Sequence, residues 1–405
     1  MEDVWRDCAP HVLAAVMRRF GDFEAAEDAV QEALLAAARQ WPVEGMPDNP
    51  KGWLIRVASR RLVDEWRSEH ARAGREELVA HRSAATPHAP SADTPREGER
   101  DESLALLLLC CHPALTRPSQ VALTLRAVGG MTTAQIARGF LVPEATMAQR
   151  ISRAKTQLKT AGARFTIPAA EQLPDRVAAV AHVLYLIFTE GHTSTSGSRL
   201  TDPELVREAI RLTRQLHRHL PTVGEVTGLL ALMLLTEARR AARTAADGSL
   251  IPLAEQDRSA WDRPLIDEGI GLVEAALPEG PVGPYQLQAA IAAVHAEAPS
   301  AADTDWRQIE ALYRMLAEQT PGPAVTLNHA VAVAAVDGPA AALAMLEPLL
   351  DDRQLRRHHR IHAVHAHLLE MAGQVEGARK AYACAASLAT SIPEQRYLNS
   401  KAAEA

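Results

Sequence analysis

Five basic side chains gather in one stretch of thirty residues, and their spacing indicates contact with nucleic acid. Residues 131–160 hold five Lys or Arg against a single acid, Glu144. After Pro143 the pattern predicts a helix whose apolar face consists of Met147, Ile151, Ala154 and Leu158. The opposite face carries small polar and basic side chains, as a helix in the major groove of DNA requires. The predicted contact residues on this face and its flanks are Ala148, Gln149, Arg150, Ser152, Arg153 and Lys155.

A second, shorter helix must hold that basic helix in place. Thr132 or Thr133 can cap a helix that carries Ile136, Ala137 and Phe140 inward. A turn at residues 142–143 then joins the two helices. The pattern therefore predicts a helix-turn-helix. The alternative is an ordinary helical hairpin with a solvated basic face.

A second basic stretch precedes this one. Residues 51–75 hold seven Lys or Arg against three acids, and tryptophans alternate with arginines along a predicted helix from Trp53 to about Arg72. Arginine together with tryptophan suits a single-stranded nucleic acid, which needs stacking as well as charge. The alternative is that Trp53 and Trp66 anchor a core and the arginines are solvated. The candidate contact residues are Trp53, Arg56, Arg60, Arg61 and Arg67.

Composition favours an all-α protein of several domains. The 405 residues are 47% hydrophobic but only 4% aromatic, which is typical of packed helices. The net charge of −7 is uneven: residues 1–165 carry +1 and residues 166–405 carry −8. A localised basic footprint is therefore expected rather than general nucleic-acid binding. The sequence has no apolar run long enough for a membrane span and no signal peptide, so we expect a cytoplasmic protein. Four cysteines without disulfide or zinc-finger spacing fit that compartment.

The helical periodicity predicts four parts. Residues 1–72 form a first helical domain, in which a helix from Phe23 to Trp41 leaves Asp28, Gln31 and Glu32 on a polar, acidic face. Residues 73–101 are rich in Ala, Pro, Ser and charge, which predicts a flexible linker. Residues 102–165 form the domain with the helix-turn-helix. Residues 166–405 form an extension whose predicted helices span 175–189, 203–218, 223–246, 262–277, 285–297, 306–318, 324–336, 339–350, 359–371, 375–388 and 393–402.

The end of the extension has the spacing of a helical repeat. Ala378, Tyr382 and Ala385 match the small-aromatic-small pattern in the second helix of a tetratricopeptide repeat, and residues 358–373 fit the first helix. Stacked helix pairs of this kind form a concave surface, so a peptide or protein ligand is expected. The alternative is an irregular helical bundle.

Three segments resemble the extracytoplasmic-function (ECF) sigma factors of bacteria, the dissociable subunits that direct RNA polymerase to promoters. AEDAVQEALLAAARQW resembles the helix that binds the polymerase β′ clamp, which implies a docking role for Asp28, Gln31 and Glu32. NPKGWLIRVASRRLVDEWR resembles the region that recognises and melts the minus-ten element, although Arg60 stands where many members have Asn. MTTAQIARGFLVPEATMAQRISRAK resembles the minus-thirty-five helix-turn-helix. The resemblance implies two partners, core RNA polymerase (β′ clamp and β flap) and promoter DNA.

The extension resembles that of one ECF subgroup, which carries a long tetratricopeptide-like domain. Matching segments include LYLIFTEGHTSTSG, YQLQAAIAAVHAEA and PEQRYLNSKAAE. For that subgroup the resemblance implies regulation by the fused domain rather than by a membrane-bound partner.

Two other classes of function remain open from the sequence. One is a helix-turn-helix regulator that binds duplex DNA without polymerase, although the acidic face of the second helix would then have no use. The other is a helical scaffold, or an enzyme with a pocket in the extension. We find no catalytic constellation and no cofactor motif, so the expected protein is not an enzyme. His358, His362 and His365 share a helical face, but no carboxylate or Cys nearby completes a metal site.

Overall fold

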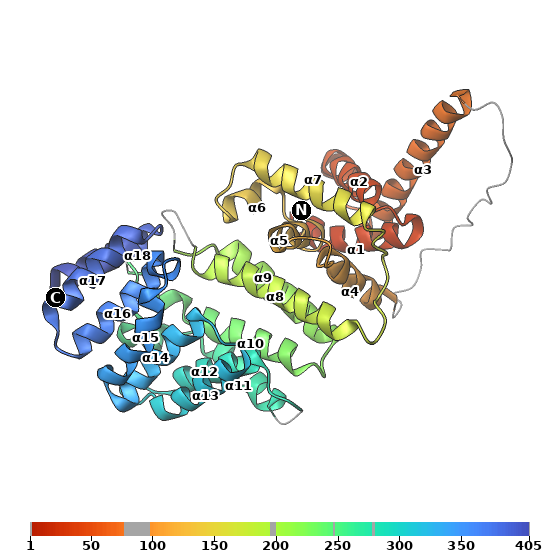
Figure 1. Ribbon diagram of the computed structural model, residues 1–405. Helices are drawn as coiled ribbons and strands as arrows, with labels where there is room; N and C mark the ends of the chain where they lie inside the picture. Colours follow the sequence, from red (N-terminus) through yellow and green to blue (C-terminus); the bar gives the residue numbers. More distant parts are fainter. Residues whose placement is uncertain (1, 77–97, 195–199, 246–247, 278–279, 405) are drawn as a thin grey trace. The chain divides into compact units, whose positions relative to one another are not determined.

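The protein folds into two compact units of α-helices, which comprise residues Met1–Val183 and Leu184–Ala405 (Figure 1). The computed structural model describes residues 2–76, 98–194, 200–245, 248–277 and 280–404. Within these ranges the only β pairing is an isolated bridge between Thr244 and Leu250. The predicted all-α class is confirmed.

Three helices form the first domain of the first unit: α1 (Glu2–Phe20), α2 (Phe23–Glu44) and α3 (Pro50–Glu76). Asp22 caps α2, where its carboxylate accepts hydrogen bonds from the backbone N–H groups of Glu24 and Ala25 at 3.0 and 3.1 Å. Val12 of α1 and Leu54 of α3 are fully buried between the helices. The helix α3 extends to Glu76, past the expected end near residue 72, so the predicted linker 73–101 begins as helix. Residues 77–97 of that linker lie outside the described ranges.

Four helices form the second domain: α4 (Gly98–Cys110), α5 (Arg117–Ala127), α6 (Thr133–Gly139) and α7 (Glu144–Thr160). Helix α4 is apolar on every side after Ser103, and its residues from Leu104 to Cys110 are all buried in the core of this domain. At the start of α6, Thr132 and Gln135 cap each other in a capping box. Leu141 takes a left-handed backbone conformation with φ 51° between α6 and α7. This short turn sets α7 against α5 and α6, as a helix-turn-helix requires.

Helix α8 (Leu173–His192) leads from the first unit into the second. Near its start Arg176 donates a hydrogen bond from Nη2 to the carbonyl oxygen of Leu108 in α4. The first half of α8 is therefore tied to the domain that carries the helix-turn-helix.

The second unit is a succession of helices in which each packs against its neighbours in sequence, and some pack against the helix after next, as in stacked repeats. The helices are α9 (Pro203–His219), α10 (Gly224–Glu237), α11 (Arg263–Ala276), α12 (Pro284–Glu297), α13 (Trp306–Gln319), α14 (Pro323–Asp337), α15 (Pro339–Asp351), α16 (His359–Met371), α17 (Val375–Leu388) and α18 (Ile392–Glu404). Ala378, Tyr382 and Ala385 are buried as the repeat pattern predicts, and the Tyr382 hydroxyl donates to Glu370 of α16 at 2.7 Å.

The predicted helix 223–246 is wrong at its end. Helix α10 stops at Glu237, and a single 3-10 turn, η1 (Arg240–Ala242), follows it. The chain then reverses at Gly248, whose φ is 82°, and Thr244 pairs with Leu250. Alanine-rich sequence continues past residue 237, so helix propensity alone did not mark the end. The end is set instead by this reversal, which returns the chain to α11.

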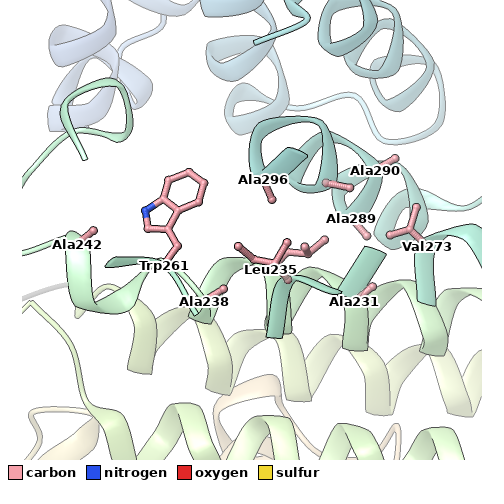
Figure 2. Packing of buried hydrophobic residues seen from close by; sticks show 11 residues of the cluster. Ala231, Leu235, Ala238, Ala242, Trp261, Val273, Ala289, Ala290 and Ala296 are labelled. Atoms are coloured by element: carbon pink, nitrogen blue, oxygen red, sulfur yellow. The ribbon is translucent and has the colours of Figure 1, made fainter. Parts of the chain in front are cut away.

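Helices α10, α11 and α12 enclose a core that contains many alanines and the indole ring of Trp261. Figure 2 shows alanines of α10 and α12 with Leu235 between them and Trp261 at one end of the cluster. A Cβ on Gly228 of α10 would lie 2.6 Å from the backbone nitrogen of Gln286 in α12. Glycine is therefore required for the close approach of these two helices.

Gly228→Ala is expected to destabilise the protein by about 1–3 kcal/mol, because the new methyl group meets backbone rather than a movable side chain. The gain in helix propensity, about 1 kcal/mol, does not offset this cost. Gly271→Ala in α11 is the matched control, since nothing lies within 4 Å of its Cβ, and it should stabilise the protein slightly. Urea unfolding of both variants measures the difference. Equal stabilities would contradict the close packing of α10 on α12.

Candidate nucleic-acid and protein interfaces

One face of α7 is buried and the other is open, as its pattern predicts. Met147, Ile151, Ala154 and Leu158 are buried against the rest of the domain. The predicted contact residues Ala148, Gln149, Ser152 and Arg153 are exposed, and Arg150 is partly exposed. Because these side chains lie on the exposed side of the second helix of a helix-turn-helix, they can reach base edges.

Lys155 differs from its neighbours on α7. Its side chain is only 11% exposed, and Nζ lies 2.5 Å from Oε2 of Glu27 and 3.5 Å from Oδ1 of Asp28, both in α2. The flank of α7 that carries Lys155 meets α2, so this predicted DNA contact is engaged by the first domain. The structure thus pairs a predicted DNA residue with a predicted docking residue.

A basic hollow lies between α1 and α3. It has a volume of about 340 Å³ and includes the exposed side chains of Arg56, Arg60 and Arg67 from the predicted set. Asp64 also lines the hollow, so one carboxylate lies among these arginines. Ser59 lies inside the hollow, and its buried hydroxyl has no hydrogen-bond partner among the described residues. A cluster of guanidinium groups around a hydroxyl suits a phosphate oxygen.

Arg19 also lines this hollow, although the sequence analysis did not identify it. It lies at the end of α1, with its guanidinium carbon 5.2 Å from the centre of the Phe20 ring. The only signal in the sequence is the pair Arg18-Arg19 in the last helical turn, and such a pair is common at helix ends because it complements the helix dipole.

Trp53 and Arg61 of α3 were also predicted to contact nucleic acid, but they do not line the hollow. Trp53 packs edge-on against Trp41 of α2, with ring centroids 5.6 Å apart, and is only partly exposed. It therefore contributes to the core, as the alternative interpretation expected, and keeps part of its ring accessible. Arg61 forms an exposed ion pair of 3.4 Å with Glu32. The side chain of Trp66 lies outside the described residues.

The acidic face of α2 is open to solvent. The side chains of Asp28 and Glu32 are 68% and 57% exposed, and Gln31 is partly exposed. Leu35 lies one turn further along the same stripe and is 59% exposed. An exposed leucine among acids is typical of a protein-binding surface rather than of a surface that contacts DNA. Leu35 was not among the residues predicted from the sequence.

Neither a membrane span nor a metal cluster is found in the described parts of the chain. No described helix is long and apolar enough to cross a bilayer. Among the same residues, no group of three or more His, Cys, Asp or Glu is arranged to hold a metal ion. Cys8, Cys110 and Cys111 are buried, and burial raises the pKa of Cys111 to about 12.

Two sigma-70 domains match the first part of the chain in the predicted order. The family model "Sigma-70 region 2" matches residues 4–72, and "Sigma-70, region 4" matches residues 105–158. Residues 176–277 match a "Family of unknown function (DUF6596)". This part of the extension is thus a domain shared with other proteins, and its family description gives no function.

One relative matches nearly the whole chain, and another matches about two fifths of it. An uncharacterized protein of Rhizobium meliloti is 41% identical over 97% of this chain and 94% of its own length. The protein of Mycobacterium tuberculosis described as "Probable ECF RNA polymerase sigma factor SigI" is 30% identical over 38% of this chain. That match spans 52% of SigI, about half of its length. No solved structure matches the chain.

The basic helix-turn-helix, the basic hollow on α3 and the acidic stripe on α2 all lie within or beside the two matched sigma regions, and a helical extension follows them. The chain belongs to the extracytoplasmic-function sigma factors of the sigma-70 family, in a form that carries a C-terminal extension domain.

Proposed function

We propose that this protein binds core RNA polymerase and directs it to promoters, acting in the cytoplasm without catalysing a reaction of its own. The proposal rests on three different surfaces of the two small domains, each of which suits a different binding partner. The acidic stripe of α2, with Asp28, Glu32 and Leu35, would dock on the polymerase β′ clamp. The basic hollow of α1 and α3 would hold the opened minus-ten strand. The exposed face of α7 would read the minus-thirty-five element.

The domain boundaries follow from the same assignment. Residues 1–72 would bind polymerase and the minus-ten element, and residues 102–165 would read the minus-thirty-five element and contact the β flap. Residues 73–101 would connect them. The extension, residues 166–405, would regulate these steps through a peptide or protein ligand. The bond from Arg176 of α8 to Leu108 of α4 supports this role, because it couples the start of the extension to the promoter-reading domain.

A promoter-binding assay tests the role of α7. Arg153→Ala should weaken binding of the holoenzyme to a cognate promoter by about 1–3 kcal/mol and relax the preference at one base pair, if Arg153 contacts a base edge. Arg164→Ala removes the same charge from an exposed position beyond α7 and serves as the control. The measurement is competition between promoter variants at fixed salt. An unchanged preference in Arg153→Ala would exclude Arg153 from recognition.

A further inference from the structure

A cavity lies within the first compact unit, where the start of α8 passes the corner between α4 and α5. Its volume is about 630 Å³, which falls in the range of about 300–1,000 Å³ that is typical of small-molecule sites. One wall comes from residues 111–120 and the other from residues 172–179. Pro113, Leu115 and Ala179 give the cavity an apolar side. It shares no residue with the basic hollow of α1 and α3, so it is a separate site.

Arg117 lies in the first wall and is held there by a buried glutamine. Gln120 is only 3% exposed, and its amide nitrogen donates to the carbonyl oxygens of Cys111 and His112 at 3.2 and 2.9 Å. Its Oε1 accepts a hydrogen bond of 2.8 Å from Nη1 of Arg117. The other N–H groups of this guanidinium have no acceptor among the described residues. Arg117 is therefore positioned at the cavity and can still bind an oxyanion.

Arg176 of α8 lies in the opposite wall. Its Nη2 donates to the carbonyl oxygen of Leu108 in α4, which fixes the side chain. Its Nε is buried and has no hydrogen-bond partner among the described residues. A buried N–H group without an acceptor costs free energy, so such groups are rare in folded proteins. Because Arg176 lines the cavity, an oxyanion bound there can supply the missing acceptor.

The cavity carries an excess of positive charge. Neither arginine forms an ion pair with a described residue, and Asp175 is the one carboxylate among the described lining residues. Burial and the charge of Arg176 lower the pKa of His112, which keeps that ring neutral. Its Nδ1 accepts a hydrogen bond of 3.2 Å from the backbone N–H of Ala114, so Nε2 carries the proton. His112 therefore adds a donor to the cavity without adding charge.

We propose that this cavity binds a small anionic metabolite, whose carboxylate or phosphate group is held between Arg117 and Arg176. A hydroxyl group of the same ligand can donate to Asp175. Arg117 belongs to α5 of the promoter-reading domain and Arg176 to the first helix of the extension, so the bound ligand ties the two together. This inference rests on the proposed function for its regulatory role, because it gives the extension a chemical signal at its attachment to that domain. Binding itself is measured without polymerase.

Thermal unfolding of the full-length protein tests the site with two probes, citrate and glycerol phosphate. Citrate supplies carboxylates and a hydroxyl, and glycerol phosphate supplies a phosphate and hydroxyls, so the effective probe distinguishes the two kinds of anion. At low millimolar concentration at least one probe should raise the thermal midpoint by about 2–4 °C relative to sodium chloride of equal ionic strength. The same probe should slow hydrogen exchange in residues 111–120 and 172–179, which locates the binding.

Substitutions of the two arginines provide the second readout. Arg117→Gln should weaken binding of the effective probe by about tenfold or more, because a charged hydrogen bond to the oxyanion is lost. The fold should survive, since Arg117 is exposed and Gln120 keeps its bonds to the backbone. Arg176→Gln should weaken binding from the opposite wall, and Arg117→Lys should retain part of the affinity. Arg138→Gln removes the same charge from an exposed position of α6 outside the cavity and is the matched control.

The absence of any shift beyond that of sodium chloride with both probes would overturn the proposed site. An equal shift in the unmutated protein and in Arg117→Gln would do so as well, because a general effect of the salt is the same in both. Slower exchange confined to other segments would place the binding elsewhere and also contradict the site. These outcomes leave the proposed function intact. Failure of the unmutated protein to bind core polymerase would instead refute the proposed function and leave the measured anion binding unchanged.

Discussion

The full-length protein with Asp28→Ala and Glu32→Ala is expected to bind core RNA polymerase about 30-fold more weakly than the unmutated protein. Each exposed carboxylate is assigned about 1 kcal/mol at the interface, and about 2 kcal/mol corresponds to that change in Kd. The fold should survive, because Asp28 and Glu32 take part only in exposed or long ion pairs, at 3.5 Å with Lys155 and 3.4 Å with Arg61. Fluorescence anisotropy of labelled protein titrated with core measures the loss.

The control for that experiment is the double variant Glu44→Ala and Asp48→Ala. These acids are also exposed, and they lie at the far end of α2 and in the turn after it. They carry the same total charge, so the control should bind core as the unmutated protein does. If both double variants lost affinity equally, the interaction would depend on net charge and the stripe on α2 would not be the docking site. Unchanged binding in the Asp28/Glu32 variant would contradict the assignment directly.

Arg19→Ala with Arg56→Ala is expected to weaken binding of the holoenzyme to single-stranded minus-ten DNA by about 100-fold or more. Charged hydrogen bonds to phosphate are worth about 1.5 kcal/mol or more each, and two are removed. The dependence of log K on log salt should also become shallower by about 1.4, because each phosphate contact on a single strand contributes about 0.7 to the slope. The loss should be the same for every base sequence.

Arg307→Ala with Arg353→Ala is the charge-matched control, since both side chains are exposed in the extension. It should change neither affinity nor slope. A slope that stayed the same in the Arg19/Arg56 variant would show that the hollow does not hold phosphate. A loss limited to one base sequence would mean that these arginines read bases instead.

Much of the helical architecture could be predicted from the sequence, because each helix has its own periodicity and end signals. The apolar stripe of α7 and the cap at Thr132 are local features, and the structure has both. The end of α10 was missed, because it depends on the return of the chain to α11 rather than on residues near Glu237. Local sequence carries no trace of such a tertiary constraint.

The sequence predicts the surfaces that are formed by a single helix. It does not predict those that form only when two helices pack together. The exposed positions of α7 follow from the phase of a single helix. Arg19 could not be found in this way, because it joins the basic hollow only when the end of α1 packs beside α3. Glu27 was missed for the same reason, since its partners Arg126 and Lys155 lie 99 and 128 residues away in the chain. Long-range ion pairs of this kind have no sequence pattern.

Transcription by purified core RNA polymerase, with and without the full-length protein, tests the assignment as a sigma factor most directly. The template is a library of upstream DNA fragments, and the 5′ ends of the transcripts are sequenced. We expect the protein to bind core and to produce transcripts with defined start sites, each preceded by shared elements near minus ten and minus thirty-five. Start sites that are the same with and without the protein, or no association with core, would contradict the assignment as a sigma factor.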